Sequence, residues 1–122
     1  MRRLKFCGTV VMLIVAGACS EAHEPRLLTG LPTDVKSAHR TLDERLAKSF
    51  PRGLAEAELV RNLRVDGFEI SPSRAEFCQT AKCATYVKWN KKEMLGQQWN
   101  VEWTLDAAKR LDRIWSSGAI LN

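Results

Sequence analysis

The residues from Gln97 to Leu105 most constrain the fold, because their polarity alternates with a period of two. The apolar positions are Trp99, Val101, Trp103 and Leu105, and the polar positions between them are Asn100, Glu102 and Thr104. This spacing is typical of a β-strand that turns one face toward a core. The core must therefore be built around a strand in the C-terminal half of the chain.

The segments around this strand predict further strands. Residues 84–89 alternate in a similar way and are separated from Gln97 by a polar loop, 90–96, which indicates a hairpin. Phe68–Ile70 is a short alternating run, and residues 74–78 fit either a short strand or an irregular segment. After a turn at 106–109 we expect a last strand over 111–116, followed by a short tail over 118–122.

Two helices are expected before the strands. The first spans Thr33–Phe50, with Thr33 or Asp34 as its N-cap and an apolar stripe made of Val35, Ala38, Leu42 and Leu46. Pro51 and Gly53 end it, and the second helix follows over Leu54–Leu63. Helices followed by three or four antiparallel strands predict an α+β fold, with the helices packed on the sheet. We assign residues 33–122 to this single domain.

The N-terminus has the layout of a secretory signal. Arg2, Arg3 and Lys5 precede an apolar run, 10–18, that ends in the small residues Ala16-Gly17-Ala18. We therefore expect residues 1–18 to be removed, which leaves 104 of the 122 residues. The stretch from Phe6 to Ser20 is short for a retained span of about 20 residues.

Two kinds of cleavage fit this signal. The segment that ends in Cys19 resembles a bacterial lipobox, in which the cysteine is lipidated and becomes the mature N-terminus. Ser20 in the next position then favours sorting to the outer membrane, and residues 19–32 would form the lipid attachment site and its tether. Ordinary cleavage after Ala18, which gives a periplasmic or secreted protein, remains the alternative.

Net charge argues against a nucleic-acid partner. The chain has 19 Lys and Arg against 14 Asp and Glu, but three of the cations lie before residue 19. The mature part keeps 16 cations and 14 acidic residues, a net charge of +2 with no strong field of one sign.

Two cysteines remain in the mature domain besides Cys19. Cys78 and Cys83 have C-x4-C spacing, which in an oxidising compartment favours a structural disulfide. A redox or metal site is the alternative, although redox motifs usually have C-x-x-C spacing and zinc needs about four ligands. We expect no metal and no cofactor.

The sequence offers no set of catalytic residues. His39 is read as a boundary residue of the first helix, because no serine or cysteine with a supporting acid can be placed beside it from the sequence. Asp43 and Glu44 are adjacent, so they point to different parts of the helix surface. No glycine-rich phosphate loop is present, and we expect the protein not to be an enzyme.

The four tryptophans give the best indication of a binding surface. Trp99 and Trp103 share the apolar face and are expected in the core. The others have cationic neighbours, and Trp and Arg are common interface anchors. The candidate interface consists of Trp89, Lys91, Lys92, Arg113 and Trp115.

The order of elements also resembles a known architecture. Residues 50–60, then Asp66-Gly67-Phe68, and the final hairpin over 99–103 and 106–114 look like the corresponding parts of BamE/SmpA-like and β-lactamase-inhibitor-protein-like domains. The resemblance covers residues 34–116, and its motifs are short. Arg52-Gly53-Leu54 and Leu63-Arg64-Val65-Asp66 depart from the usual Gly-Met and Leu-Gly-x-Pro patterns of BamE-type proteins.

These observations predict a non-enzymatic lipoprotein of the bacterial envelope, on the periplasmic face of the outer membrane. The lipid would anchor the protein to the membrane, and the domain would bind another envelope protein. The alternative is a secreted, non-lipidated inhibitor or thiol-active protein that uses Cys78 and Cys83.

Overall fold

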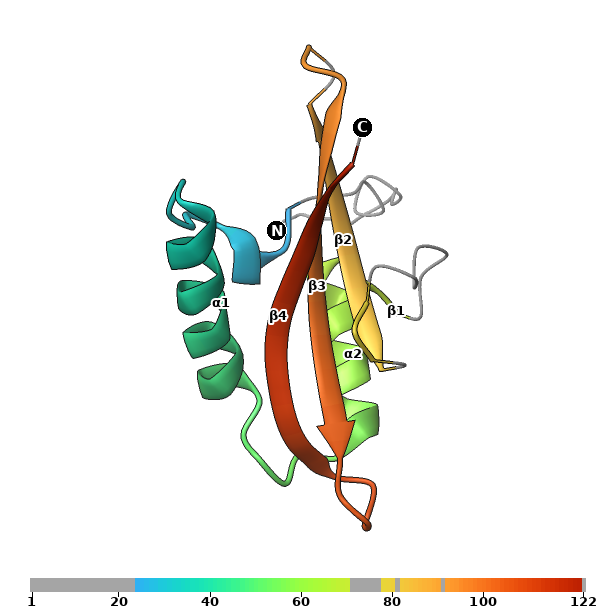
Figure 1. Cartoon of the computed structure of the whole chain (residues 1–122). Helices are drawn as coiled ribbons and strands as arrows, with labels where there is room; N and C mark the ends of the chain where they lie inside the picture. The colour runs from blue at the N-terminus through green and yellow to red at the C-terminus, as the bar shows by residue number, and fades with distance from the viewer. Residues whose placement is uncertain (1–23, 71–77, 81, 91, 122) are drawn as a thin grey trace, which may run out of the picture.

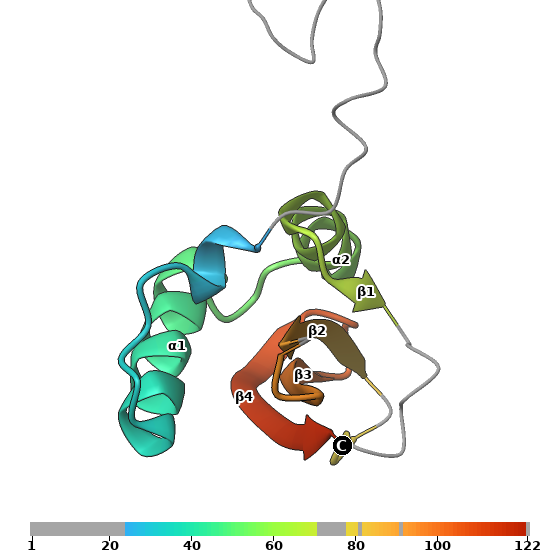
Figure 2. The ribbon, with the colours of Figure 1, turned by 90° about the horizontal axis from the view of Figure 1, so that it is seen from above.

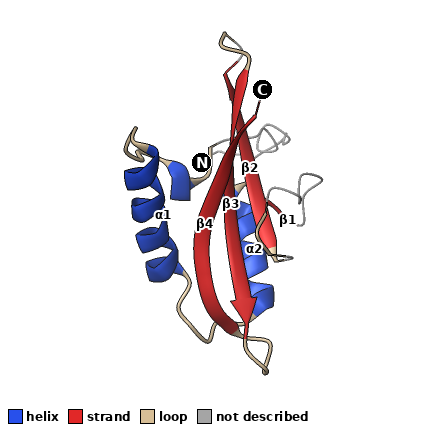
Figure 3. Ribbon diagram, in the orientation of Figure 1, coloured by secondary structure: helices blue, strands red, loops and turns tan. Residues whose placement is uncertain are grey.

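The computed structural model describes residues 24–70, 78–80, 82–90 and 92–121. Two helices precede the sheet, as Figure 1 shows, and Figure 3 separates helices from strands by colour. The elements are η2 (Arg26–Leu28), α1 (Val35–Ser49), α2 (Glu56–Asp66), β1 (Glu69–Ile70), β2 (Cys83–Asn90), β3 (Leu95–Leu105) and β4 (Leu111–Leu121).

The sheet confirms the predicted α+β class. Its four strands lie in the order β1-β2-β3-β4, and every neighbouring pair is antiparallel. Viewed along the strands, the sheet curls strongly, with α1 beside β4 and α2 beside β1 and β2 (Figure 2). Cys19 lies outside the described residues, as do residues 71–77, which include most of the segment left open between strand and irregular structure.

Helix α1 forms where the apolar stripe predicts it, but its first apolar residue is not in the core. Asp34 is the N-cap and accepts a hydrogen bond from the Ser37 amide at 2.9 Å, which lowers the pKa of the Asp34 carboxyl. Ala38, Leu42 and Leu46 are buried. Val35 was predicted on the same stripe, but it is 52% exposed because it lies at the very start of the helix.

The core begins earlier in the chain than the predicted boundary at residue 33. Leu28 is buried, and Leu27 and Leu31 pack against the core, although residues 20–32 had the composition of a tether. The carboxylate of Asp66, at the end of α2, accepts the backbone amides of Arg26 and Leu27 at 2.8 and 3.3 Å. These bonds fix the start of the described chain to the end of α2.

Helix α2 begins two residues later and ends three residues later than predicted. Leu59 and Leu63 are fully buried beneath it. Gly67 ends the helix in the left-handed conformation, with φ of 110°, so the predicted stop at Asp66-Gly67 is confirmed.

Strand β3 supplies the centre of the apolar core, as its alternation predicts. Trp99, Val101 and Trp103 are buried on the face that packs against the helices. The indole Nε1 of Trp103 donates to the Glu56 carboxylate at 2.9 Å, so a tryptophan of the sheet bonds to the first residue of α2.

Strand β4 is longer than predicted. It continues to Leu121, through the residues 118–121 that the sequence assigned to a tail. A register shift between Thr104 and Leu105 changes the alternation at its start, so that Leu105 pairs with Leu111. Leu111 is therefore buried in the core, and Ile114 packs against it.

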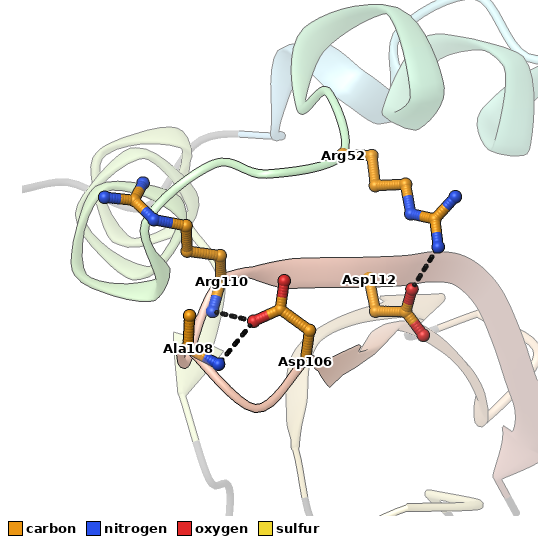
Figure 4. A network of polar contacts seen from close by, with 5 residues as sticks. All are labelled: Arg52, Asp106, Ala108, Arg110 and Asp112. Carbon is orange, nitrogen blue, oxygen red and sulfur yellow. Dashed lines mark hydrogen bonds and ion pairs between the residues drawn. The ribbon is translucent and has the colours of Figure 1, made fainter.

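The turn between β3 and β4 is fastened to the link between the helices. Asp106 accepts the amides of Ala108 and Arg110 at 2.9 and 3.0 Å, and Arg52 forms an ion pair with Asp112 at 3.0 Å (Figure 4). The Arg110 guanidinium also donates to the Gly53 carbonyl at 3.1 Å. This end of the molecule is thereby closed, while the β2–β3 hairpin extends freely from the other end (Figure 1).

We expect Leu63→Ala to lower the free energy of unfolding by about 2–5 kcal/mol, because it removes a fully buried side chain and leaves a cavity. Val65→Ala on the same helix is the control, since Val65 is exposed, and it should change stability by less than about 0.5 kcal/mol. Urea unfolding followed by circular dichroism measures both. Equal effects of the two substitutions would contradict the assigned core.

We expect the contacts of the Glu56 carboxylate with Trp103 and Lys82 to make the free energy of unfolding depend on pH in the acid range. Burial alone raises the pKa of the Glu56 carboxyl, but bonds from Trp103 and Lys82 outweigh it and hold the pKa below its ordinary value of 4.5. Folding therefore favours the charged carboxylate. The stabilisation is complete above the unfolded-state pKa and is lost as pH falls through the lower folded-state pKa.

Glu56→Gln should be less stable than the unchanged chain by about 1 kcal/mol at pH 7, and this difference should shrink as the pH falls below about 4. Unfolding measured from pH 7 to pH 3 tests this, with the exposed Glu58→Gln as the control on the same helix. A pH-independent difference between the Glu56→Gln and unchanged chains would refute the assignment.

Candidate functional site: the polar face of the sheet

The predicted interface residues fall into two groups. Trp89 and Lys92 lie at the β2–β3 hairpin, where both are exposed. Arg113 and Trp115 lie on β4, where the Arg113 guanidinium is placed over the Trp115 ring at 5.2 Å from its centroid. Lys91 lies outside the described residues.

Trp89 and the Arg113–Trp115 pair occupy the sheet face opposite the apolar core, but at different ends. Trp89 pairs with Gly96 of β3, and Trp115 pairs with Glu102. These β3 partners are six residues apart, so the two aromatic groups are separated by about 20 Å along the strand. The structure therefore offers two small surfaces rather than one continuous patch.

Polar side chains fill the middle of this face. We call them the polar cluster: Thr85, Gln98, Asn100, Glu102 and Ser117. The amide oxygen of Asn100 accepts from Thr85 Oγ1 at 2.9 Å and from Gln98 Nε2 at 2.8 Å. Its amide nitrogen donates to Ser117 Oγ at 3.2 Å. Asn100 therefore joins three strands through side chains alone.

Glu102 is the chemically most unusual member of the cluster, because its carboxyl group is fully buried. The Ser117 hydroxyl donates to one of its oxygens. The Thr80 backbone amide donates to the other at 2.7 Å, and the Thr80 hydroxyl lies 3.1 Å from the same atom. Burying such a group is costly unless donors satisfy it, so these partners are needed for the fold.

A short segment, Cys78–Thr80, which we call the strap, brings the amide and hydroxyl of Thr80 to Glu102. The sulfur atoms of Cys78 and Cys83 lie 2.02 Å apart, so the predicted disulfide pair is present. Closing so short a loop stabilises the fold by about 2 kcal/mol in the chain-entropy model. Cys83 is buried in the sheet and Cys78 is partly buried.

The strap also positions the exposed pair on β4. The Trp115 indole Nε1 donates to the side-chain oxygen of Gln79 at 3.3 Å, and Gln79 lies within the strap. Arg113 is exposed above the Trp115 ring, and Trp115 is half-buried. Trp115 is therefore held by a segment that is disulfide-bonded to β2 and hydrogen-bonded to Glu102.

Two atoms of this face have no hydrogen-bond partner within the described part of the chain. The Gln98 side-chain oxygen and the Thr104 hydroxyl are both buried and unpaired. Unpaired buried polar atoms are uncommon in folded proteins.

His39 lies in a different polar group, on the helix side of the sheet. Its Nδ1 is 2.9 Å from the Ser116 hydroxyl, and its ring centroid is 5.0 Å from that of Trp99. Asp43 accepts the Ser116 backbone amide at 2.7 Å. An acid, an imidazole and a hydroxyl thus lie close together, a grouping that the sequence did not reveal.

The hydrogen bonds of this group nevertheless serve to connect helix α1 to strand β4. In a nucleophilic triad the acid orients the imidazole, whereas here Asp43 bonds to the backbone of β4. The Ser116 hydroxyl also donates to the His39 carbonyl oxygen at 3.4 Å, which connects the strand to the helix a second time.

Open hollows lie elsewhere on the molecule. One of about 390 Å³ lies between the start of the described chain and the base of the hairpin, beside Leu31, Val35 and Trp99. Another of about 700 Å³ is bordered by Arg26, Arg45, Lys48 and Val65. Neither includes a residue of the polar cluster.

The described residues include neither a candidate metal site nor a candidate membrane-spanning helix. Among them, no three His, Cys, Asp or Glu side chains gather closely enough to hold a metal ion. None of the helices in this part of the chain is both long and apolar enough to cross a bilayer.

Comparison of the chain with protein-family models, curated proteins and solved structures found no match. Function is therefore inferred from the residues and their contacts.

We expect the disulfide and Glu102 to stabilise the fold through one shared contact. Loss of the disulfide in a Cys78→Ser/Cys83→Ser chain should cost about 2 kcal/mol plus part of the Thr80–Glu102 bonding. In a Glu102→Leu background that second part is already lost, so removal of the disulfide should cost less by about 1 kcal/mol.

Urea unfolding of the four chains of this cycle measures the difference. Glu69→Leu, at an exposed position of β1, is the control and should leave the cost of losing the disulfide unchanged. Additive costs for Glu102→Leu and the cysteine substitutions would show that the strap and Glu102 act independently.

Proposed function

We propose that this chain is a non-enzymatic interaction module of the bacterial envelope, anchored by lipid on Cys19. In this proposal it binds another envelope protein through Arg113 and Trp115. The observation that carries it is the position of Arg113 Cζ over the Trp115 ring, 5.2 Å from the ring centroid, on a sheet face that the helices leave uncovered. Trp and Arg are the residue types that most often supply the binding energy of an interface.

The support beneath this pair favours recognition. Trp115 bonds to Gln79 of the strap, and the strap is held by the disulfide and by Glu102. A side chain fixed before binding loses little conformational freedom on binding, which improves affinity. The polar cluster has a clear use in this proposal, because it makes the exposed pair rigid.

Charge indicates the chemistry of the partner. Arg113 makes no ion pair with another described residue, and its cation–π contact with Trp115 leaves its N–H groups available. A planar guanidinium binds a carboxylate through two parallel hydrogen bonds. We therefore expect the partner to present an acidic side chain next to an apolar one.

The architecture also supports an envelope role. Two helices before an antiparallel sheet is the arrangement that the BamE/SmpA resemblance implies. A periplasmic location would supply the oxidising conditions in which the Cys78–Cys83 bond persists.

A photoreactive amino acid at position 104, which pairs with Arg113 across the sheet and leaves Arg113 in place, tests the binding surface in the full chain expressed in a bacterium. We expect an adduct of one defined size, and Trp115→Ala should lower its yield about tenfold or more, because an aromatic anchor is lost. The same photoreactive group at Arg61, an exposed residue of α2, is the control position. Equal adducts at both positions, or no effect of Trp115→Ala, would refute the assigned surface.

Trp115→Phe keeps an aromatic ring and separates recognition from folding, since it should retain most of the adduct. Thermal unfolding of each variant shows whether it is folded. The mass of the N-terminal peptide tests the anchor separately: an acylated Cys19 supports it, and an unmodified Cys19 excludes it.

A further inference from the structure

The tip of the β2–β3 hairpin carries an unusual amount of exposed apolar surface. Of the five large hydrophobic side chains exposed in the described part of the chain, three lie here: Trp89 at 50%, Met94 at 76% and Leu95 at 38% exposure. Figure 1 shows that this hairpin extends beyond both helices. These exposed side chains therefore belong to a hairpin that extends beyond the helices.

The Trp89 ring is held in place by a glycine on the neighbouring strand. A Cβ atom built on Gly96 would lie 3.0 Å from two ring carbons of Trp89, so the indole lies directly against the β3 backbone. This contact orients a half-exposed indole at the hairpin end of the sheet. Lys88 and Lys92 are exposed close to it in the sequence.

The described chain begins beside this hairpin. Glu24 pairs with Lys88 of β2 at 3.3 Å, one residue before Trp89. Cys19 precedes Glu24 by five residues, which span at most about 18 Å when fully extended. A lipid on Cys19 would therefore hold the hairpin end of the domain, and not the closed end at Asp106, next to the bilayer.

We propose that the β2–β3 hairpin tip lies in the headgroup layer of the membrane that anchors the chain; this inference rests on the lipid anchor of the proposed function. Tryptophan prefers the boundary between headgroups and acyl chains, because its ring is apolar and its N–H is polar. Met94 and Leu95 add apolar contact, and lysines are attracted to anionic lipids. The hairpin is a second, weaker membrane contact that sets the orientation of the domain.

This orientation is compatible with the proposed protein-binding surface. Arg113 and Trp115 lie about 20 Å along the sheet from Trp89. With the hairpin on the membrane, the pair would lie about 20 Å from the hairpin contact and stay accessible to a partner.

Tryptophan fluorescence of the full chain, purified from cells with its natural N-terminus and placed in vesicles, tests the contact. The vesicles contain phosphatidylcholine with brominated acyl chains, with or without phosphatidylglycerol. We expect quenching in the unchanged chain, and Trp89→Phe should lose at least half of it. Trp115→Phe is the matched control and should keep the quenching, since Trp115 lies at the other end of the sheet.

Charge and apolar contact are separated by two further measurements. Phosphatidylglycerol should increase the quenching, and Lys92→Gln should reduce that increase. Met94→Asp should reduce quenching in both kinds of vesicle, because it places a charge in the apolar tip. Far-ultraviolet circular dichroism shows that each variant keeps its fold.

The outcomes separate this inference from the anchor. An acylated Cys19 with quenching that depends on Trp89 supports both. An acylated Cys19 with equal quenching in Trp89→Phe and the unchanged chain overturns the hairpin contact alone, and crosslinks from position 94 to a protein or a second copy would identify its true occupant. An unmodified Cys19 overturns the anchor and this inference together.

Discussion

The structure depends on the burial of β3 on both of its faces. Trp99, Val101 and Trp103 are covered by the helices, while Gln98, Asn100 and Glu102 are buried on the other side. Apolar side chains gain from this directly, whereas each polar one needs a hydrogen-bond partner. The helices cover the apolar side chains. The polar cluster and the strap supply hydrogen-bond partners for the polar ones, so most contacts outside the apolar core are made around β3.

The buried hydrogen-bond network on the polar face of β3 has a consequence for the proposed function. An apolar second layer would tolerate small shifts, but a buried network is satisfied only when its donors and acceptors keep their positions. Thr80 must stay above Glu102, and Asn100 must stay between Thr85 and Ser117. The cluster therefore favours a rigid surface, which is what a binding site in the proposed function needs.

Alternation in the sequence was enough to predict β3 and its apolar face, because Trp and Val at every second position allow few other structures. It could not predict that the polar face is buried, since Asn100 and Glu102 look the same in a strand exposed to water. Their partners Thr80 and Ser117 are distant in sequence, so the network is a product of the fold. The nearest signal was the disulfide pair, which marks a loop fixed to β2.

The missed end of β4 has a similar cause. Ser116-Ser117-Gly118 contains no strong strand formers, but Ser117 is needed by Glu102 and Asn100. A Cβ atom on residue 118 would lie 2.6 Å from the Gln98 carbonyl oxygen, so the strand can pair there only because the residue is glycine. Pairing extends β4 toward the hairpin along β3. The residues that made this end look like a tail in the sequence are thus the ones that place Ser117 beside Glu102 and Asn100, so the end of the strand and the polar cluster depend on each other.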